Sequence, residues 1–432
     1  MICLAALGAA AQMPRVLSLD EALRIARERQ PQLREARAAV EAAQARVDQS
    51  RAPFLPQVGG LVTYQHNLRP SASASGVTAP APSGGTTPAP SVTTGRSANF
   101  YNAAITLNQL IWDFGKTAGQ YEASKLLASA QQNAERTVAL QIDNNVRAAF
   151  FQARATRALV GVAREAVDNF GKHLDQTQGF VEAGTRPEID LAQARADLAN
   201  AKAQLIDAQN NYLISKAQLN QAMGVAGASD YDVADESLAP VPDEDAALES
   251  LAQQALTNRP ELLSIENQVR AQLETVRAFK GGYWPTISGN VGATEGGANP
   301  DDLTWNATLG LTLSWQLFQG GETRAQVHEA EAVAGQLSAQ LDLQRLQVRL
   351  DVEQALLAIR AAKSVLEAQR ETVLNARDRL RLAEGRYETG VGNAIELGDA
   401  QVALTTAEAQ TVQADDRLST ARAQLLRALG QK

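Results

Sequence analysis

Four segments of the chain alternate apolar residues with small neutral polar residues and contain no Lys, Arg, Asp or Glu. They cover residues 55–67, 100–112, 283–294 and 303–318. In the last segment Leu309, Leu311 and Leu313 share one face, and neutral polar residues occupy the other. Strands of soluble proteins usually place charges on the water side, whereas membrane barrel strands of about 9–11 residues pair an apolar face with a polar one. The pattern predicts membrane-spanning strands, with two soluble hairpins packed on a helical body as the alternative.

The rest of the chain has the longer period of α-helices. Residues 116–183 and 322–389 each predict one helix, and at 1.5 Å per residue such a helix is about 100 Å long. The helices that follow, from Leu191 and from Leu397, place Leu and Ala at spacings that alternate between three and four residues. This heptad pattern predicts coiled-coil packing. It does not distinguish a solid bundle from a hollow helical barrel.

The chain contains an internal duplication. Pro31 in ERQPQL corresponds to Pro260 in TNRPEL at an offset of 229 residues, and Gly184 corresponds to Gly390 at an offset of 206. Residues 70–97, which are rich in Pro, Ser, Thr and Gly, account for the difference and are predicted to form a loop. The resulting division is a first repeat at 12–224, a linker at 225–246 and a second repeat at 247–432. Each repeat is expected to run helix, two strands, very long helix, turn, helix.

Composition narrows the class of protein. Of 432 residues, 40 are Lys or Arg and 48 are Asp or Glu, and this net charge of -8 argues against a nucleic-acid partner. The single cysteine, Cys3, excludes an internal disulfide framework. Residues 1–11 read MICLAALGAAA and are expected to be the remnant of a signal peptide. No run of 18 apolar residues is present, so no membrane-spanning helix is predicted.

Aromatic residues cluster at both ends of the predicted strands. Those near the hairpin tips are Tyr64, Tyr101 and Trp305, and those near the helix ends are Trp112, Trp284 and Trp315. Two such groups are typical of the aromatic belts at the two faces of a membrane. Four strands alone would leave open sheet edges in lipid, so the sheet is expected to close by oligomerisation. A trimer would supply twelve strands, although this argument does not by itself select three.

A set of short motifs completes this pattern. They are LSLDEAL at 17–23, NRPEL at 258–262, LFQGG at 317–321, and the paired turns AGTRPEIDLAQA and TGVGNAIELGDA. In this order, on two repeats, they resemble the TolC-like outer membrane efflux family over residues 17–430. The resemblance implies an α+β membrane protein of the bacterial outer membrane. It implies a homotrimer with one 12-stranded β-barrel that continues into a 12-helix coiled-coil barrel across the periplasm, with the linker in an equatorial belt.

The resemblance also implies a function. Proteins of this family are outer-membrane ducts of tripartite efflux or type I secretion systems, docked to a periplasmic membrane-fusion adaptor and through it to an inner-membrane pump. Conduction is expected to be passive, without a cofactor, and gated at the periplasmic tip. The alternative is a periplasmic coiled-coil adaptor or scaffold without a barrel. The exported substrate and the particular pump cannot be derived from the sequence.

The gate is expected at the two helical turns. Glu396 and Asp399 match acidic residues that line the narrowest point in the family, and a trimer would bring six such carboxylates together. A ring of this kind favours cations. The alternative is a solvated acidic face of one helix, on which the two residues are neighbours at i and i+3.

A second set of gate contacts is implied by the resemblance. Asp190 matches an Asp that contacts a Tyr, here Tyr387, and an Arg whose position is occupied here by Gly392. The contact is therefore expected to be weaker or built differently, and we hypothesise that Arg186 compensates. The turn residues matching the adaptor-docking region are Gly184, Thr185, Arg186, Gly390, Val391 and Gly392. The alternative role of Gly184 and Gly390 is helix capping, and both roles are compatible.

Sequence motifs for chemistry are missing. His66, His173 and His328 are scattered, with no Cys or carboxylate at metal-ligand spacing, so no metal site is predicted. No nucleophile elbow, phosphate-binding loop or dinucleotide-binding motif is found. The sequence therefore favours a conduit over an enzyme.

Overall fold

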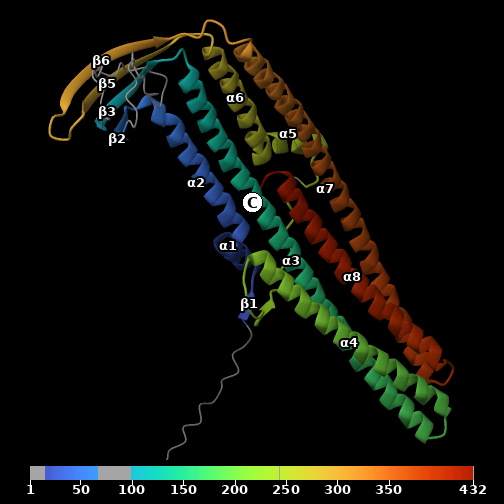
Figure 1. Cartoon of the computed structure of the whole chain (residues 1–432). Helices are drawn as coiled ribbons and strands as arrows, with labels where there is room; N and C mark the ends of the chain where they lie inside the picture. The colour runs from blue at the N-terminus through green and yellow to red at the C-terminus, as the bar shows by residue number, and fades with distance from the viewer. Residues whose placement is uncertain (1–14, 67–98, 243, 432) are drawn as a thin grey trace, which may run out of the picture. The chain divides into compact units, whose positions relative to one another are not determined.

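The computed structural model of the chain describes residues 15–66, 99–242 and 244–431 (Figure 1). The signal-peptide remnant expected at 1–11 and the loop expected at 70–97 lie outside these ranges. None of the helices within them combines the length and the apolarity needed to cross a membrane.

The two repeats contain the same series of elements. The first repeat consists of α1 (Leu19–Arg29), α2 (Pro31–Arg51), the 3-10 turn η1 (Ala52–Phe54), β2 (Gln57–His66), β3 (Asn99–Trp112), α3 (Lys116–Glu182) and α4 (Glu188–Met223). The second consists of α5 (Leu248–Asn258), α6 (Pro260–Gly281), β5 (Thr286–Gly297), β6 (Thr304–Ser314), α7 (Glu322–Glu388) and α8 (Ala394–Ala428). The long helices α3 and α7 have 67 residues each, one fewer than expected.

The helical segment before each hairpin is broken into two helices. Gln30 and Arg259, at the breaks, have extended backbones. Each is followed by a proline, Pro31 or Pro260, and the proline ring disfavours the helical conformation of the residue before it. The proline itself begins the next helix, where its missing N–H leaves no hydrogen bond unmade.

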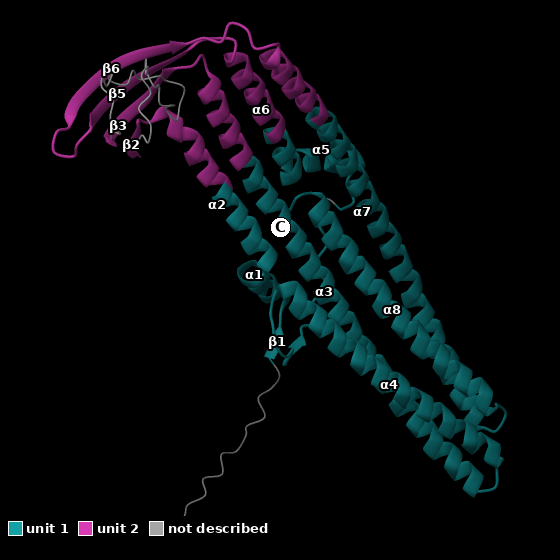
Figure 2. Ribbon diagram, in the orientation of Figure 1, with its two compact units in different colours: residues 1–42, 129–267, 337–432 teal, residues 43–128, 268–336 magenta. Residues whose placement is uncertain are grey.

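One compact unit comprises residues 1–42, 129–267 and 337–432 (Figure 2). Its core consists of clusters at equivalent positions of the two repeats. Fully or nearly fully buried members are Ala22, Phe150 and Leu219 in the first repeat and Leu251, Leu356 and Leu425 in the second. In each case a short helix packs against the long helix and the heptad helix of its own repeat. The linker contributes β4 (Tyr231–Val233), which pairs in parallel with β1 (Arg15–Leu17).

The heptad seam is buried mainly through its alanines. In α4, Ala194 and Ala201 are buried, and in α8 the same holds for Ala400, Ala407 and Ala414. Ala201 packs with Ala166 and Phe170 of α3, and Ala407 packs with Val373 and Ala376 of α7. Small side chains let helices approach closely. The seam therefore holds α4 against α3 and α8 against α7 as two antiparallel pairs.

The second compact unit comprises residues 43–128 and 268–336 and contains the sheet (Figure 2). Its strands are antiparallel in the order β2-β3-β5-β6. The β3–β5 pairing joins the hairpins of the two repeats, and its register shifts between Leu110 and Trp112. Among the described strands, β2 and β6 have a neighbour on one side only.

The sheet differs from the sequence prediction in two details. The expectation that the strands lack charge is wrong at Glu295, because β5 extends to Gly297 and places Glu295 opposite Trp305 near the hairpin end. Strand β6 ends at Ser314, four residues earlier than expected. The apolar face is uncovered within the chain, since Leu309 and Leu311 are 84% and 78% exposed.

Candidate functional site

The two long helices end in the same turn. In each, a glycine adopts a left-handed backbone, with φ of 73° at Gly184 and 78° at Gly390. The N–H groups of Gly184 and Thr185 donate to carbonyl groups of the last turn of α3, and those of Gly390 and Val391 do the same in α7. This is the Schellman arrangement, which requires glycine for its φ angle. Apart from the neighbouring residues of its own turn, no described atom lies within 4 Å of where a Cβ would stand on either glycine.

The second turn is packed tightly around Gly392. A Cβ on this residue would lie 3.1 Å from backbone atoms of Arg386 and Tyr387, and the Gly392 N–H donates to the Arg386 carbonyl. A longer side chain here, such as the arginine found in the family, would require the backbone to shift. The turn leads into α8, whose N-cap Asn393 accepts a hydrogen bond from the Glu396 N–H at 2.7 Å.

Arg186 connects the first turn to the second. Its guanidinium group donates to the carbonyl oxygens of Tyr387 at 3.1 Å and of Gly392 at 2.9 Å. The guanidinium carbon also lies 4.6 Å from the centre of the Tyr387 ring. A cation above an aromatic face and two charged hydrogen bonds to carbonyl groups are both attractive. These contacts join the two turns within one chain, and the hypothesis that Arg186 compensates for the missing arginine stays a prediction.

Tyr387 is the centre of the contacts between α3 and α7. It is 1% exposed, and its hydroxyl lies 3.1 Å from the Thr177 hydroxyl, which is also buried. The edge of its ring meets His173 and Phe180 at centroid distances of 5.2 and 5.9 Å. Within the described residues the Tyr387 hydroxyl pairs with Thr177 of α3, and the contact with Asp190 implied by the family resemblance stays a prediction.

His173 is a buried titratable group beside Tyr387. Burial lowers the pKa of its imidazole, and the nearby carboxylates of Asp197 and Asp190 only partly oppose this effect. Its Nδ1 has no hydrogen-bond partner within the described structure. The neutral imidazole is therefore the form that fits this packing.

The two predicted gate carboxylates differ in their surroundings. The Glu396 carboxylate is partly buried and lies 3.2 Å from the Arg386 guanidinium group. Asp399 is exposed and makes no ion pair within the described part of the chain. The sequence analysis did not predict the ion pair between Arg386 and Glu396. The signal for it was a basic residue in the last turn of α7, just before Gly390. The uncompensated negative charge therefore lies at Asp399.

The predicted interface aromatics lie at two ends of the sheet. Near the hairpins, Tyr64 pairs with Tyr101 at 5.0 Å between ring centres, and Trp305 is 73% exposed. The other group comprises Trp112, Trp284 and Trp315, all more than half exposed, which lie near the ends of the strands that adjoin the helices. Phe114 joins this group by stacking on Trp284 at 5.3 Å. The Trp315 indole N–H donates to the Tyr283 carbonyl at 3.2 Å.

An ion-pair network in the linker was not anticipated. Glu244, in what the sequence showed only as an acidic run, is 5% exposed and accepts hydrogen bonds from Arg422 of α8 at 3.0 and 3.1 Å. Lys363 of α7 lies 2.8 Å from the same carboxylate. Burial alone would raise the pKa of Glu244, but the hydrogen bonds from Arg422, Lys363 and the Val241 N–H hold it below its ordinary value. The network ties the linker to α7 and α8.

Comparisons with known proteins agree with this architecture. The family model described as outer membrane efflux protein matches residues 22–225 and 251–431. The chain belongs to the outer membrane efflux protein family. The matched segments cover nearly all of both repeats and leave out most of the linker.

Individual relatives are distant in sequence and close in fold. The chain is 23% identical to the outer membrane protein TolC of Escherichia coli (strain K12) over 408 residues, which cover 89% of this chain and 76% of that protein. It is 23% identical to the probable outer membrane lipoprotein SilC of Salmonella typhimurium, over 70% of this chain and 66% of that protein. A crystal structure of a membrane protein from Pseudomonas aeruginosa superposes with a TM-score of 0.82 at 20% identity, covering 96% of this chain and 90% of that one. The shared fold and the family place this chain in the outer membrane.

Proposed function

We propose that this protein is the outer-membrane duct of a tripartite efflux or type I secretion system, a homotrimer that conducts substrates passively from the periplasm to the exterior. The observation that supports this most strongly is the sheet of unit 2. It combines an uncovered apolar face with two open edges, β2 and β6. Open edges and exposed apolar strands are stable in lipid only when the sheet closes. Three copies would close it as twelve strands.

The two turns are the proposed periplasmic gate. Tyr387, held by Thr177 and Arg186, keeps α7 against α3 in the closed state. Glu396 and Asp399 of all three copies would together form the acidic ring at the narrowest point. Because Glu396 faces Arg386, the cation preference of the ring rests mainly on Asp399.

The same turns are the proposed docking surface for the periplasmic adaptor. The space around Gly184 and Gly390 is open within the chain. Thr185 and Val391, which follow the glycines, are exposed. An adaptor hairpin could therefore contact the backbone of both turns without displacing side chains. The inner-membrane pump would be reached only through this adaptor.

Extraction and cross-linking test the proposal against the alternative of a periplasmic adaptor or scaffold. We expect the protein to require detergent for extraction from cell envelopes. Cysteines placed at exposed positions of β2 and β6, Val58→Cys with Leu309→Cys, should cross-link into a species of three chains. A protein that is released without detergent and remains monomeric would contradict the duct.

A further inference from the structure

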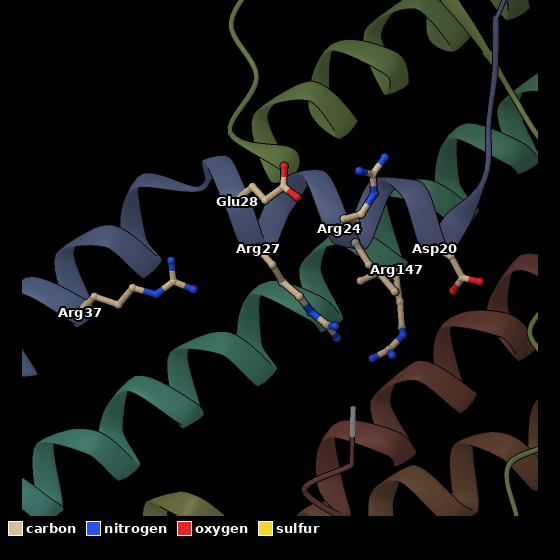
Figure 3. A pocket seen from close by; sticks show the side chains of 7 residues that line it. Asp20, Arg24, Arg27, Glu28, Arg37 and Arg147 are labelled. Carbon is tan, nitrogen blue, oxygen red and sulfur yellow. The ribbon is translucent and has the colours of Figure 1, made fainter.

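A cavity of unit 1 lies among α1, α2 and α3, away from the two helical turns. It has a volume of about 880 Å³. Its charged lining consists of Arg24, Arg27, Arg37 and Arg147 with Asp20 and Glu28 (Figure 3). Neither the duct function nor the turn contacts explains why arginines from three helices meet here.

Three of these arginines have an acidic partner within the chain. Arg27 donates to both carboxylate oxygens of Asp143, at 3.0 and 2.6 Å. Arg37 lies 3.5 Å from Glu135, and Arg24 lies 3.8 Å from Glu21. Arg147 has no ion pair and no hydrogen bond among the described residues, and its Nε is buried without a partner.

Arg147 is also the most buried residue of the lining, at 6% exposure. Burial lowers the pKa of the Arg147 guanidinium group. The Asp143 carboxylate raises this pKa, and the positive charge of Arg27 lowers it further. A guanidinium group nevertheless stays charged, with five N–H donors in a fixed fork. Leaving the buried Nε–H of Arg147 unpaired is costly, because the desolvation of a charged donor is not repaid.

Figure 3 shows the side chains of Arg27 and Arg147 extending to the same side of α1, while Arg24 and Glu28 extend away from them. Asp143 accepts two hydrogen bonds from Arg27 and none from Arg147, so it does not satisfy the Arg147 fork. The group that fits a free guanidinium fork is a planar or tetrahedral oxyanion, which accepts two parallel hydrogen bonds.

We propose that this cavity is a binding site for a small oxyanion of the phosphate type, held by the guanidinium group of Arg147 with Arg27 beside it. Three helices of the chain, α1, α2 and α3, contribute to its lining, and the buried, unpartnered Nε belongs to the most buried residue of that lining. A small solute fits a cavity of this volume. Asp20 and Glu28 offset part of the positive charge of the four arginines. An oxyanion with one or two negative charges therefore balances the remaining charge of the lining.

Calorimetric titration of inorganic phosphate into the full-length protein in detergent tests the site, with chloride replacing phosphate at equal ionic strength as the blank. We expect saturable binding of one phosphate per chain. Arg147→Gln should abolish it, and Arg147→Lys, which keeps the charge and loses the fork, should weaken it by at least about tenfold. Arg164→Gln, an exposed position on the same helix, is the matched control and should bind like the unmodified protein.

Two results would overturn the proposal. One is that titration of phosphate into the unmodified protein gives no heat of binding. The other is that the unmodified protein and the Arg147→Gln variant bind phosphate equally well. If the unmodified protein binds no phosphate while the Arg147 variants dissociate the oligomer, the partner of Arg147 is a carboxylate of a second copy and the small-oxyanion site is wrong. Arg147→Lys keeps the test valid should Arg147→Gln fail to fold, because the buried charge is retained.

Discussion

Replacing Arg186 by Ala would remove the connection between the two turns while leaving the backbone of both in place. Arg186 makes two charged hydrogen bonds to carbonyl groups and lies over the Tyr387 ring. The Schellman turn at Gly184 does not involve the Arg186 side chain. The variant therefore tests whether this side chain holds the turns together.

The expected magnitude follows from these contacts. Charged hydrogen bonds contribute about 1.5–3 kcal/mol each when well desolvated, and a cation over an exposed ring about 0.5–1 kcal/mol. Arg186 is partly exposed, and contacts made by one side chain do not add fully, so we take about 2–3 kcal/mol for all three. Since about 1.4 kcal/mol changes an equilibrium tenfold, the population with separated turns should rise by about 30- to 140-fold.

Single-channel recording in planar bilayers measures this shift. We expect Arg186→Ala to show more frequent and longer openings of higher conductance than the unmodified channel, and Arg186→Lys to fall between them. Arg195→Ala is the matched control, because Arg195 is exposed on α4 and makes no ion pair or hydrogen bond within the described residues. Openings of Arg186→Ala that match those of Arg195→Ala would refute the connection as a gate contact.

Three further predictions concern single side chains. Asp399→Ala should reduce the cation preference of the channel more than Glu396→Ala, since Glu396 faces Arg386; equal reversal-potential shifts would show that the ion pair does not matter. Tyr387→Phe should lower the free energy of unfolding by about 1 kcal/mol through loss of one buried hydrogen bond, and an unchanged thermal midpoint would contradict this. Burial raises the pKa of Asp416 to about 6, so its ionisation costs stability as pH rises from about 4 through 6. Asp416→Asn should therefore melt at higher temperature than the unmodified protein at pH 7.5 but not at pH 4, and a gap independent of pH would exclude this cause.

The positions of the long elements were readable from the sequence because they depend on local pattern. A run of 67 residues with helical periodicity can form only a long helix, and Gly184 and Gly390 end the two runs because a Schellman turn needs a left-handed residue. The charge-free alternation likewise marked all four strands. Even the breaks before Pro31 and Pro260 follow from local steric rules.

Contacts between distant segments were decided only by the tertiary structure. The Tyr387 hydroxyl meets the Thr177 hydroxyl, and only the packing of α3 against α7 determines this. The linker sequence does not predict that Glu244 is buried between Arg422 and Lys363. Local pattern records which residues can form an element, whereas the partner of a side chain depends on which elements meet across 200 residues of sequence. For that physical reason the sequence determined the elements and the duplication of this protein, and the fold alone decided the contacts at the two turns, the linker network and the unpaired Arg147 Nε.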